Sequence, residues 1–168
     1  MPKNVKPLGQ ECAKRCFYLP TPPLLPADWQ HAQPADLNKA DSEITSLNIG
    51  SLESLIALNG NNWRKIVVIM AKLSAPDDDW RGYMHKLLQH DEQIRFGADA
   101  LSSMACEHYV CGQQSAIALG LTPLSEPKTF THQQDNDNQI YLLPYLDYRQ
   151  CPNALIADLR KLRESLTG

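Results

Sequence analysis

Apolar residues recur at helical spacing over most of the chain after residue 49. Between 62 and 73 they cover much of the circumference of a helix, which is typical of a helix at the centre of a fold. Over 80–88 they fall at i, i+3, i+4, i+7 and i+8, which predicts an amphipathic helix. A shorter helix is expected over 52–58, and the aspartates at 77–79 suit the first turn of the helix that follows them.

The second half of the chain predicts two more helices and one strand. A helical stretch is expected over 91–119, followed by a polar loop over 122–139. Residues 140–148 are the one convincing strand candidate, and Pro144 would confine that strand to a sheet edge. An amphipathic helix opening at Pro152 closes the chain.

Prolines set the beginning of the chain apart from the rest. Seven of the twelve prolines lie at or before Pro34, and they prevent a continuous helix there. We therefore predict a proline-rich extended arm over 1–46 and a helical domain over 47–168. The expected fold class is mostly α: a single helical domain with that arm and a small β element near 140–148.

Composition places the chain among globular proteins. Of its 168 residues 43% are hydrophobic and 21% are charged, which suits one domain with a real core and excludes wholesale disorder. The formal net charge of −3 argues against a general attraction to nucleic acid or to anionic membranes. The strongest apolar run, 66–71, is too short for a transmembrane helix, so we expect no membrane insertion, a cytoplasmic location and free cysteine thiols.

Two pairs of residues suggest a zinc site. Cys12 and Cys16 are four apart, and His108 and Cys111 are three apart, so on helices each pair would share one face. Together they would form a tetrahedral Cys3His ligand set. Neither pair has the CxxC spacing of common zinc modules, so ordinary buried cysteines are the competing interpretation, and no cofactor other than zinc is suggested.

Residues 113–127 suggest a helix-turn-helix. The segment 116–122 has a small residue, a glycine and a capping threonine in the places that such a turn requires. Pro127 would fall in the second turn of the recognition helix, and the protein is acidic. A transcription regulator therefore remains an alternative function.

The sequence contains none of the familiar catalytic or phosphate-binding motifs, so we expect no enzymatic activity and no small-molecule substrate. The expected function is that of a non-enzymatic adaptor, which contacts other proteins of a larger bacterial assembly. Apolar anchors are typical of such interfaces. The candidates are Tyr18, Leu25 and Trp29 in the arm and Leu155, Leu159, Leu162 and Leu166 in the last helix. The competing interpretation is that all of them pack within the chain.

The arm also carries a resemblance to a known family. Cys16-Phe-Tyr-Leu19 followed by Leu25-Pro-Ala-Asp-Trp29 is similar to the opening of the K component (OrgA/MxiK-like) of the type III secretion sorting platform. The resemblance covers residues 16 to 72 and includes no catalytic or ligand motif. It implies a linker protein at the cytoplasmic face of the inner membrane, held there by a protein partner.

Overall fold

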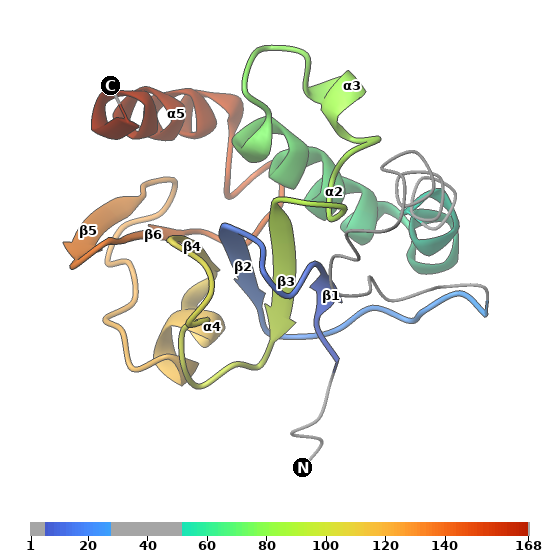
Figure 1. The fold of residues 1–168 in the computed structure, drawn as a ribbon, viewed down its shortest axis with the longest axis horizontal. Coiled ribbons are helices and arrows are strands. Elements are labelled where there is room, and N and C mark those ends of the chain that lie inside the picture. The colour runs from blue at the N-terminus through green and yellow to red at the C-terminus, as the bar shows by residue number, and fades with distance from the viewer. Residues whose placement is uncertain (1–5, 28–51, 168) are drawn as a thin grey trace.

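The structure, a computed structural model, describes residues 6–27 and 52–167, which form a six-stranded mixed β-sheet with helices on both faces (Figure 1). The strand order is β1-β3-β2-β4-β6-β5. The four inner strands are parallel: β2 (Arg15–Leu19), β3 (Glu92–Phe96), β4 (Glu107–Cys111) and β6 (Asn138–Leu143). The edge strands β1 (Leu8–Gly9) and β5 (Thr131–Asp135) are antiparallel to their neighbours. The fold is therefore α/β, and the prediction of a mostly α, single helical domain is wrong.

The central strand β2 comes from the segment that we expected to be an extended arm. Its five residues are all buried, and it pairs in parallel with β3 on one side and with β4 on the other. A parallel strand covered on both faces shows no alternation of apolar and polar residues. The segment 15–19 therefore shows no clear strand pattern, and the prolines that follow it from residue 20 favoured the prediction of an extended arm.

Strands β3 and β4 replace the helix that was predicted over 91–119. Both strands place polar side chains inside the fold: Glu92 and His108 are fully buried, and Gln93 is nearly so. These residues are stabilised by partners on neighbouring strands, which helical periodicity cannot reveal. The only helix in this stretch is α4 (Gln113–Ala118), directly after β4.

The remaining helices match the sequence pattern more closely. A helix covers 52–59, α2 spans Asn61–Ser74 and α5 spans Asn153–Thr167. The expected helix over 80–88 is reduced to α3 (Trp80–Tyr83). Beyond Tyr83 the chain continues as turns over 84–89, with His85 donating its backbone N–H to the Gly82 carbonyl at 3.2 Å. Leu88, which has a φ of 68°, donates its backbone N–H to the Glu92 carboxylate at 3.0 Å.

The strand expected near 140–148 is β6, but it lies between β4 and β5 and not at an edge. Pro144 follows the last residue of the strand and so removes no hydrogen bond from within it. Part of the expected loop over 122–139 forms β5, which pairs with β6 as a hairpin. Its residues are mostly exposed and polar, so they carry no core signal.

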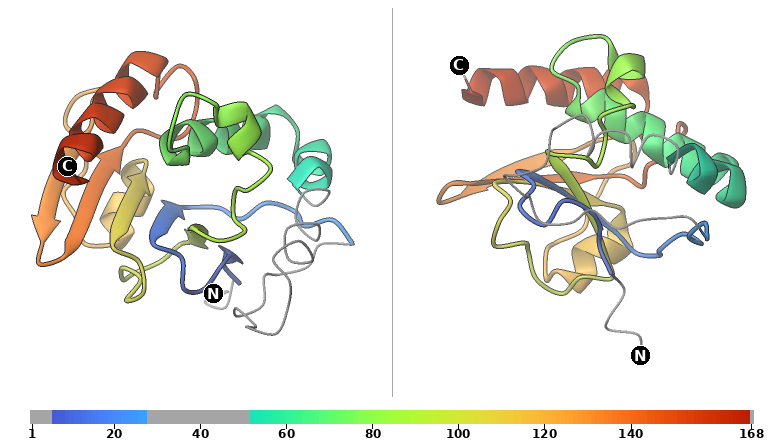
Figure 2. Two further views of the ribbon diagram at one scale, coloured as in Figure 1. Left: turned by 45° about the horizontal axis from the view of Figure 1, so that its top comes forward. Right: turned by 45° about the vertical axis from the view of Figure 1, so that its right-hand side comes forward.

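The sheet separates two apolar cores. Helices α2 and α5 lie on one face of the sheet and α4 on the other (Figure 2). The larger core lies between the sheet and helices α2 and α5, and it contains stacked rings of Phe17, Tyr109 and Tyr141 from three neighbouring strands. The smaller core lies on the face that α4 covers and includes Tyr18 and Val110. None of the helices described is both long and apolar enough to cross a membrane.

Candidate ligand-binding site

The order of the strands indicates where a ligand would bind. After β2 the chain returns to the sheet as β3 on one side, and it later places β4 on the other side of β2. Helix α2 lies on one face of the sheet and α4 on the opposite face (Figure 2). In open α/β sheets such a reversal of strand order leaves a crevice at the carboxyl ends of the strands, where ligands commonly bind.

A cleft of about 790 Å³ lies at this position. Its lining includes residues that end β4 and β6 or follow β2, β4 and β6: Pro20, Thr21, Cys111, Gly112, Leu142, Leu143, Pro144 and Tyr145. Further lining comes from α4, from the 124–127 segment and from Gln150. The volume lies within the usual range for sites that bind small molecules.

Gly112 forms the turn from β4 into α4 at the edge of this cleft. Its φ of 93° and ψ of 162° define a conformation that only glycine adopts without strain. The backbone N–H donates to the Leu143 carbonyl at 2.9 Å, which ties the turn to the end of β6. A Cβ at this position would lie 3.5 Å from the Tyr145 ring, so Gly112 and Tyr145 pack closely against each other.

Uncharged groups dominate the lining of the cleft. Three glutamines, Gln113, Gln114 and Gln150, offer both hydrogen-bond donors and acceptors. Tyr145 adds an aromatic ring, and burial raises the pKa of its hydroxyl, which therefore stays protonated. Among the described residues that line the cleft, Glu126 is the only one with a formal charge, and none is Lys, Arg or His.

Cys111 is the obvious nucleophile in this lining, but its environment is unsuitable. The side chain is fully buried, and burial raises the pKa of the thiol well above its ordinary value. The thiol is within hydrogen-bonding distance of the Tyr109 carbonyl, at 3.4 Å. Because the thiolate is the reactive form, Cys111 is poorly suited to covalent chemistry. The arrangement favours non-covalent binding of a polar, uncharged ligand.

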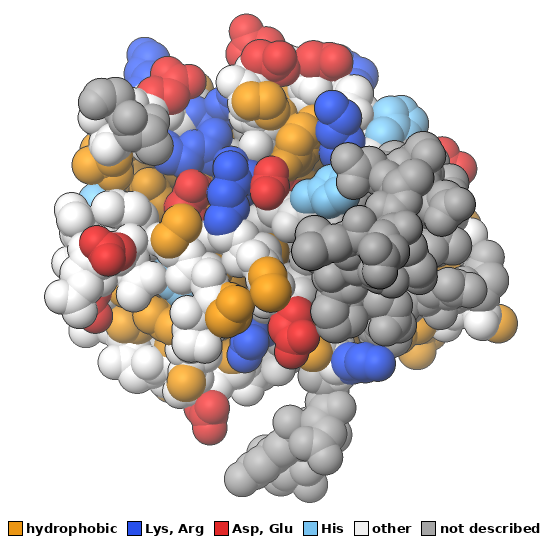
Figure 3. Space-filling model, in the orientation of Figure 1, with side chains coloured by type: hydrophobic (Ala, Val, Ile, Leu, Met, Phe, Trp, Pro, Cys, Tyr) orange, Lys and Arg blue, Asp and Glu red, His pale blue; other side chains and the backbone are white. Residues whose placement is uncertain are grey.

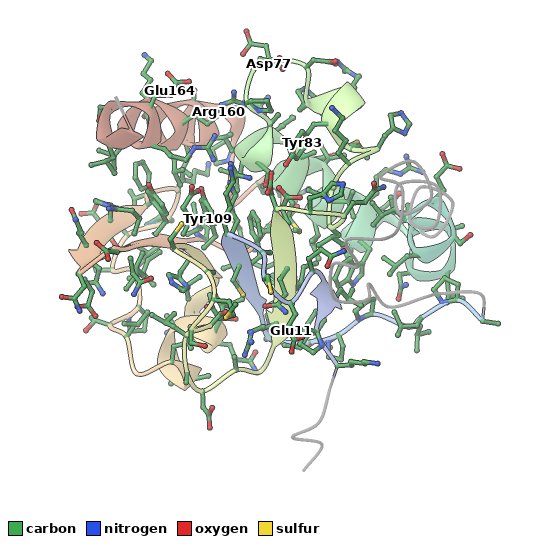
Figure 4. All side chains as sticks on the ribbon, viewed as in Figure 1. Glu11, Asp77, Tyr83, Tyr109, Arg160 and Glu164 are labelled. Atoms are coloured by element: carbon green, nitrogen blue, oxygen red, sulfur yellow. The ribbon has the colours of Figure 1, made fainter. Side chains whose placement is uncertain are left out.

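A network of buried charges lies at the opposite end of the same strands. Arg15 bridges Glu92 at 3.1 Å and Glu107 at 3.2 Å, each residue being the first of its strand. Tyr83 of α3 donates to Glu92 at 2.5 Å, and Tyr109 of β4 donates to Glu107 at 2.8 Å (Figure 4). Since every charge named here has a partner, this network holds α3 and the strands together and is not a ligand site.

A shallower hollow of about 450 Å³ lies between α5 and the α2–α3 region. It combines Lys72, Arg160 and Lys161 with acidic residues, and both signs of charge mix on this part of the surface (Figure 3). Arg160 lies on the side of α5 toward Asp77 and donates to the carbonyls of Lys72 and Asp77 (Figure 4). These bonds hold the end of α2, so the hollow does not define a ligand of one charge.

The four residues of the predicted zinc set do not meet. Cys16 and His108 are partners in adjacent strands, but Cys111 belongs to the core on the other face of the sheet and Cys12 is exposed. Three residues along a strand separate two side chains onto opposite faces, whereas the prediction assumed helices. Within 6–27 and 52–167 there is no cluster of three His, Cys, Asp or Glu that could hold a metal ion.

His108 has a structural arrangement of its own. Its Nδ1 lies 2.8 Å from the Tyr18 hydroxyl and its Nε2 lies 3.1 Å from Oδ1 of Asn138. The same hydroxyl accepts the backbone N–H of Ser102 at 2.8 Å. Burial lowers the pKa of His108, which favours the neutral ring. In the neutral tautomer that suits both partners, Nε2–H donates to Oδ1 of Asn138 and Nδ1 accepts from the Tyr18 hydroxyl. His108 thereby stabilises the position of the β5–β6 hairpin through Asn138 and, through the Tyr18 hydroxyl, that of the loop after β3.

The candidate contact residues are divided between core and surface. Tyr18, Leu155 and Leu159 are buried, Leu162 is half-buried, Leu25 and Leu166 are exposed, and Trp29 lies outside the described residues. The buried side chains already have partners within the chain. For the helix-turn-helix alternative, α4 is six residues long, and residues 119–130 contain no second helix.

Sequence reasoning did not identify the cleft. A usable signal was present in Tyr109-Val-Cys-Gly-Gln113, where an apolar run ends at a glycine before a helix. This is the pattern of a strand, a turn and a helix at a ligand crevice, but it was hidden because the whole stretch fitted a helix.

A search of curated proteins and a search of solved structures each found no match. A family model described as "Family of unknown function (DUF6942)" matches residues 6–164, which is nearly the whole chain. The chain therefore belongs to the DUF6942 family.

Proposed function

We propose that this protein binds a small, uncharged, planar ligand with amide-like edges, of the nucleobase or nucleoside class, in the cleft at the carboxyl ends of its parallel strands. The observation that carries the proposal is the composition of the lining: three glutamines and a tyrosine, with no cationic side chain among the lining residues that the structure describes. The proposal replaces the sequence-based expectation that no small molecule is bound.

The glutamines suggest the edge chemistry of the ligand. A side-chain amide presents one donor and one acceptor side by side, and it pairs with the same combination on the edge of a base. The Tyr145 ring adds a flat apolar surface against which a heterocycle can stack. Apolar groups such as Ile117 and Leu142 complete the walls, as in most small-molecule sites.

The absence of cations among the described lining residues argues against a phosphorylated ligand. Sites for phosphate groups normally supply Arg, Lys or a longer helix amino terminus. Here α4 has only six residues, and the one charged residue is the acidic Glu126. A nucleoside should therefore bind at least as well as its 5′-monophosphate.

Binding of nucleosides and their monophosphates by isothermal titration calorimetry tests the proposal. Gln113→Ala removes one hydrogen-bonding amide and should weaken nucleoside binding roughly 3- to 10-fold, the usual effect of one hydrogen bond. Gln134→Ala is the matched control, because Gln134 lies on β5 and does not line the cleft. Failure of every nucleoside to bind, or consistently tighter binding of the monophosphates, would contradict the proposal.

The adaptor function, the cytoplasmic location and the link to type III secretion gain no support from the family or the fold. Of the apolar anchors on which the adaptor prediction depends, Leu25 and Leu166 are exposed in the described part of the chain. We therefore base the proposed function on the cleft.

A further inference from the structure

We infer that Glu126 recognises a pair of N–H donors on the ligand, so that the cleft selects a guanine-type edge. This inference rests on the proposed function and adds the identity of the base and the residue that distinguishes it.

Glu126 is unusual among the residues of the cleft. Its backbone carbonyl accepts a hydrogen bond from Oγ1 of Thr129 at 3.0 Å, but within 6–27 and 52–167 its carboxylate has no ion-pair or hydrogen-bond partner. Its neighbours in the lining are Leu124, Ser125 and Pro127, none of which is a cation. In the empty cleft, water can solvate the carboxylate, since the residue is exposed.

A bound ligand changes the solvation of the Glu126 carboxylate. As the ligand fills the cleft it displaces water from the lining, and a carboxylate that loses water without gaining a donor is strongly destabilised. No residue of the described lining can supply a compensating positive charge. A ligand that presents donors to Glu126 compensates for the water that the carboxylate loses, and a ligand that lacks them should bind more weakly.

Among the bases, guanine matches a carboxylate best. Its ring N1–H and its exocyclic 2-amino group point in the same direction and can reach both carboxylate oxygens, as the guanidinium of arginine does. Hypoxanthine has the N1–H but not the amino group, and uracil likewise offers a single ring N–H beside acceptors. The three glutamines remain available for the acceptor groups of the base.

Guanosine and inosine provide a direct test, because they differ only in the 2-amino group. By calorimetry the full chain should bind guanosine on the order of tenfold more tightly than inosine, which reflects one hydrogen bond to a charged group. Glu126→Gln should remove most of this difference by weakening guanosine, because the amide oxygen is a weaker acceptor and its nitrogen opposes a donor. Asp135→Asn, an exposed acidic residue on β5 outside the cleft, should leave both affinities unchanged.

The outcomes separate the inference from the proposed function. If guanosine and inosine bind equally, or if Glu126→Gln preserves the preference for guanosine, the role of Glu126 is refuted while nucleoside binding stands. If neither nucleoside binds, both proposals are refuted. Melting curves show whether each variant is folded before its affinities are compared.

Discussion

Replacing Arg15 by methionine should strongly destabilise the protein, and the structure allows the loss to be estimated. The Arg15 side chain is 10% exposed and lies within 3.2 Å of two carboxylates, one of which, Glu92, is completely buried. Without Arg15, the charge of Glu92 keeps, among the residues of 6–27 and 52–167, only the hydrogen bonds from Tyr83 and from the backbone of Leu88. Removing one partner of a buried ion pair costs about 3–5 kcal/mol in the free energy of unfolding.

A neighbouring ion pair provides the control. Lys14 directly precedes β2 and Asp91 directly precedes β3. The two charged groups lie 3.9 Å apart, but their side chains are 50% and 45% exposed. Lys14→Met should therefore change the free energy of unfolding by less than about 1 kcal/mol. Urea denaturation followed by circular dichroism measures both variants, and the melting temperature of Arg15→Met should fall by roughly 6–20 °C.

The comparison can refute the reasoning directly. If Arg15→Met is no more destabilising than Lys14→Met, the buried charges are not what holds the amino ends of the strands together. If Arg15→Met does not fold at all, Arg15→Lys is the variant to measure. Lysine keeps the positive charge but lacks the separate nitrogen atoms with which Arg15 contacts Glu92 and Glu107, so this variant should fold with a stability between those of the wild type and Arg15→Met.

Two further predictions concern titration and thiol chemistry. Burial lowers the pKa of His108, so the unfolded chain binds a proton at this residue more readily than the native protein does. The stability that the neutral His108 contributes is therefore present above about pH 6.5, the ordinary pKa of histidine, and is lost as the pH falls below that value. Urea midpoints between pH 7.5 and 5.5 should fall more steeply for the wild type than for His108→Gln, and identical slopes would contradict this assignment. A thiol reagent should modify the exposed Cys12 and Cys106 quickly in the native protein and the other three cysteines only after unfolding. Rapid modification of Cys111, located by peptide mass spectrometry, would show that the base of the cleft opens.

The helix over 52–59, α2 and α5 were predictable from the sequence, whereas the sheet was not. Helix α2 and helix α5 present apolar faces to one side of the sheet, and their periodicity survives because most of their polar residues face outward. In β3 and β4 the residues that begin each strand are Glu92 and Glu107, which are stabilised inside the fold by Arg15, 77 and 92 residues away in the sequence. No local window contains both members of such a pair, so a strand that begins with a buried charge looks like a surface helix.

The candidate site was hidden for a related reason. The cleft is formed where the ends of three strands and the start of α4 meet, and its residues come from five separate stretches between 20 and 150. Periodicity identifies elements, but it does not order strands within a sheet. Without the order β3-β2-β4-β6, nothing brings Thr21, Gly112 and Tyr145 to one place.

The position of β2 has a consequence for how the chain folds during synthesis. The central strand is synthesised well before either of its neighbours, because its partners Glu92 and Glu107 lie 77 and 92 residues after Arg15. At 5–20 residues per second, β2 waits roughly 5–20 s before β4 exists. During that time an apolar strand with two unpaired edges is exposed to other nascent chains and to chaperones. The nascent protein should therefore depend on protection of β2 until β3 and β4 have emerged.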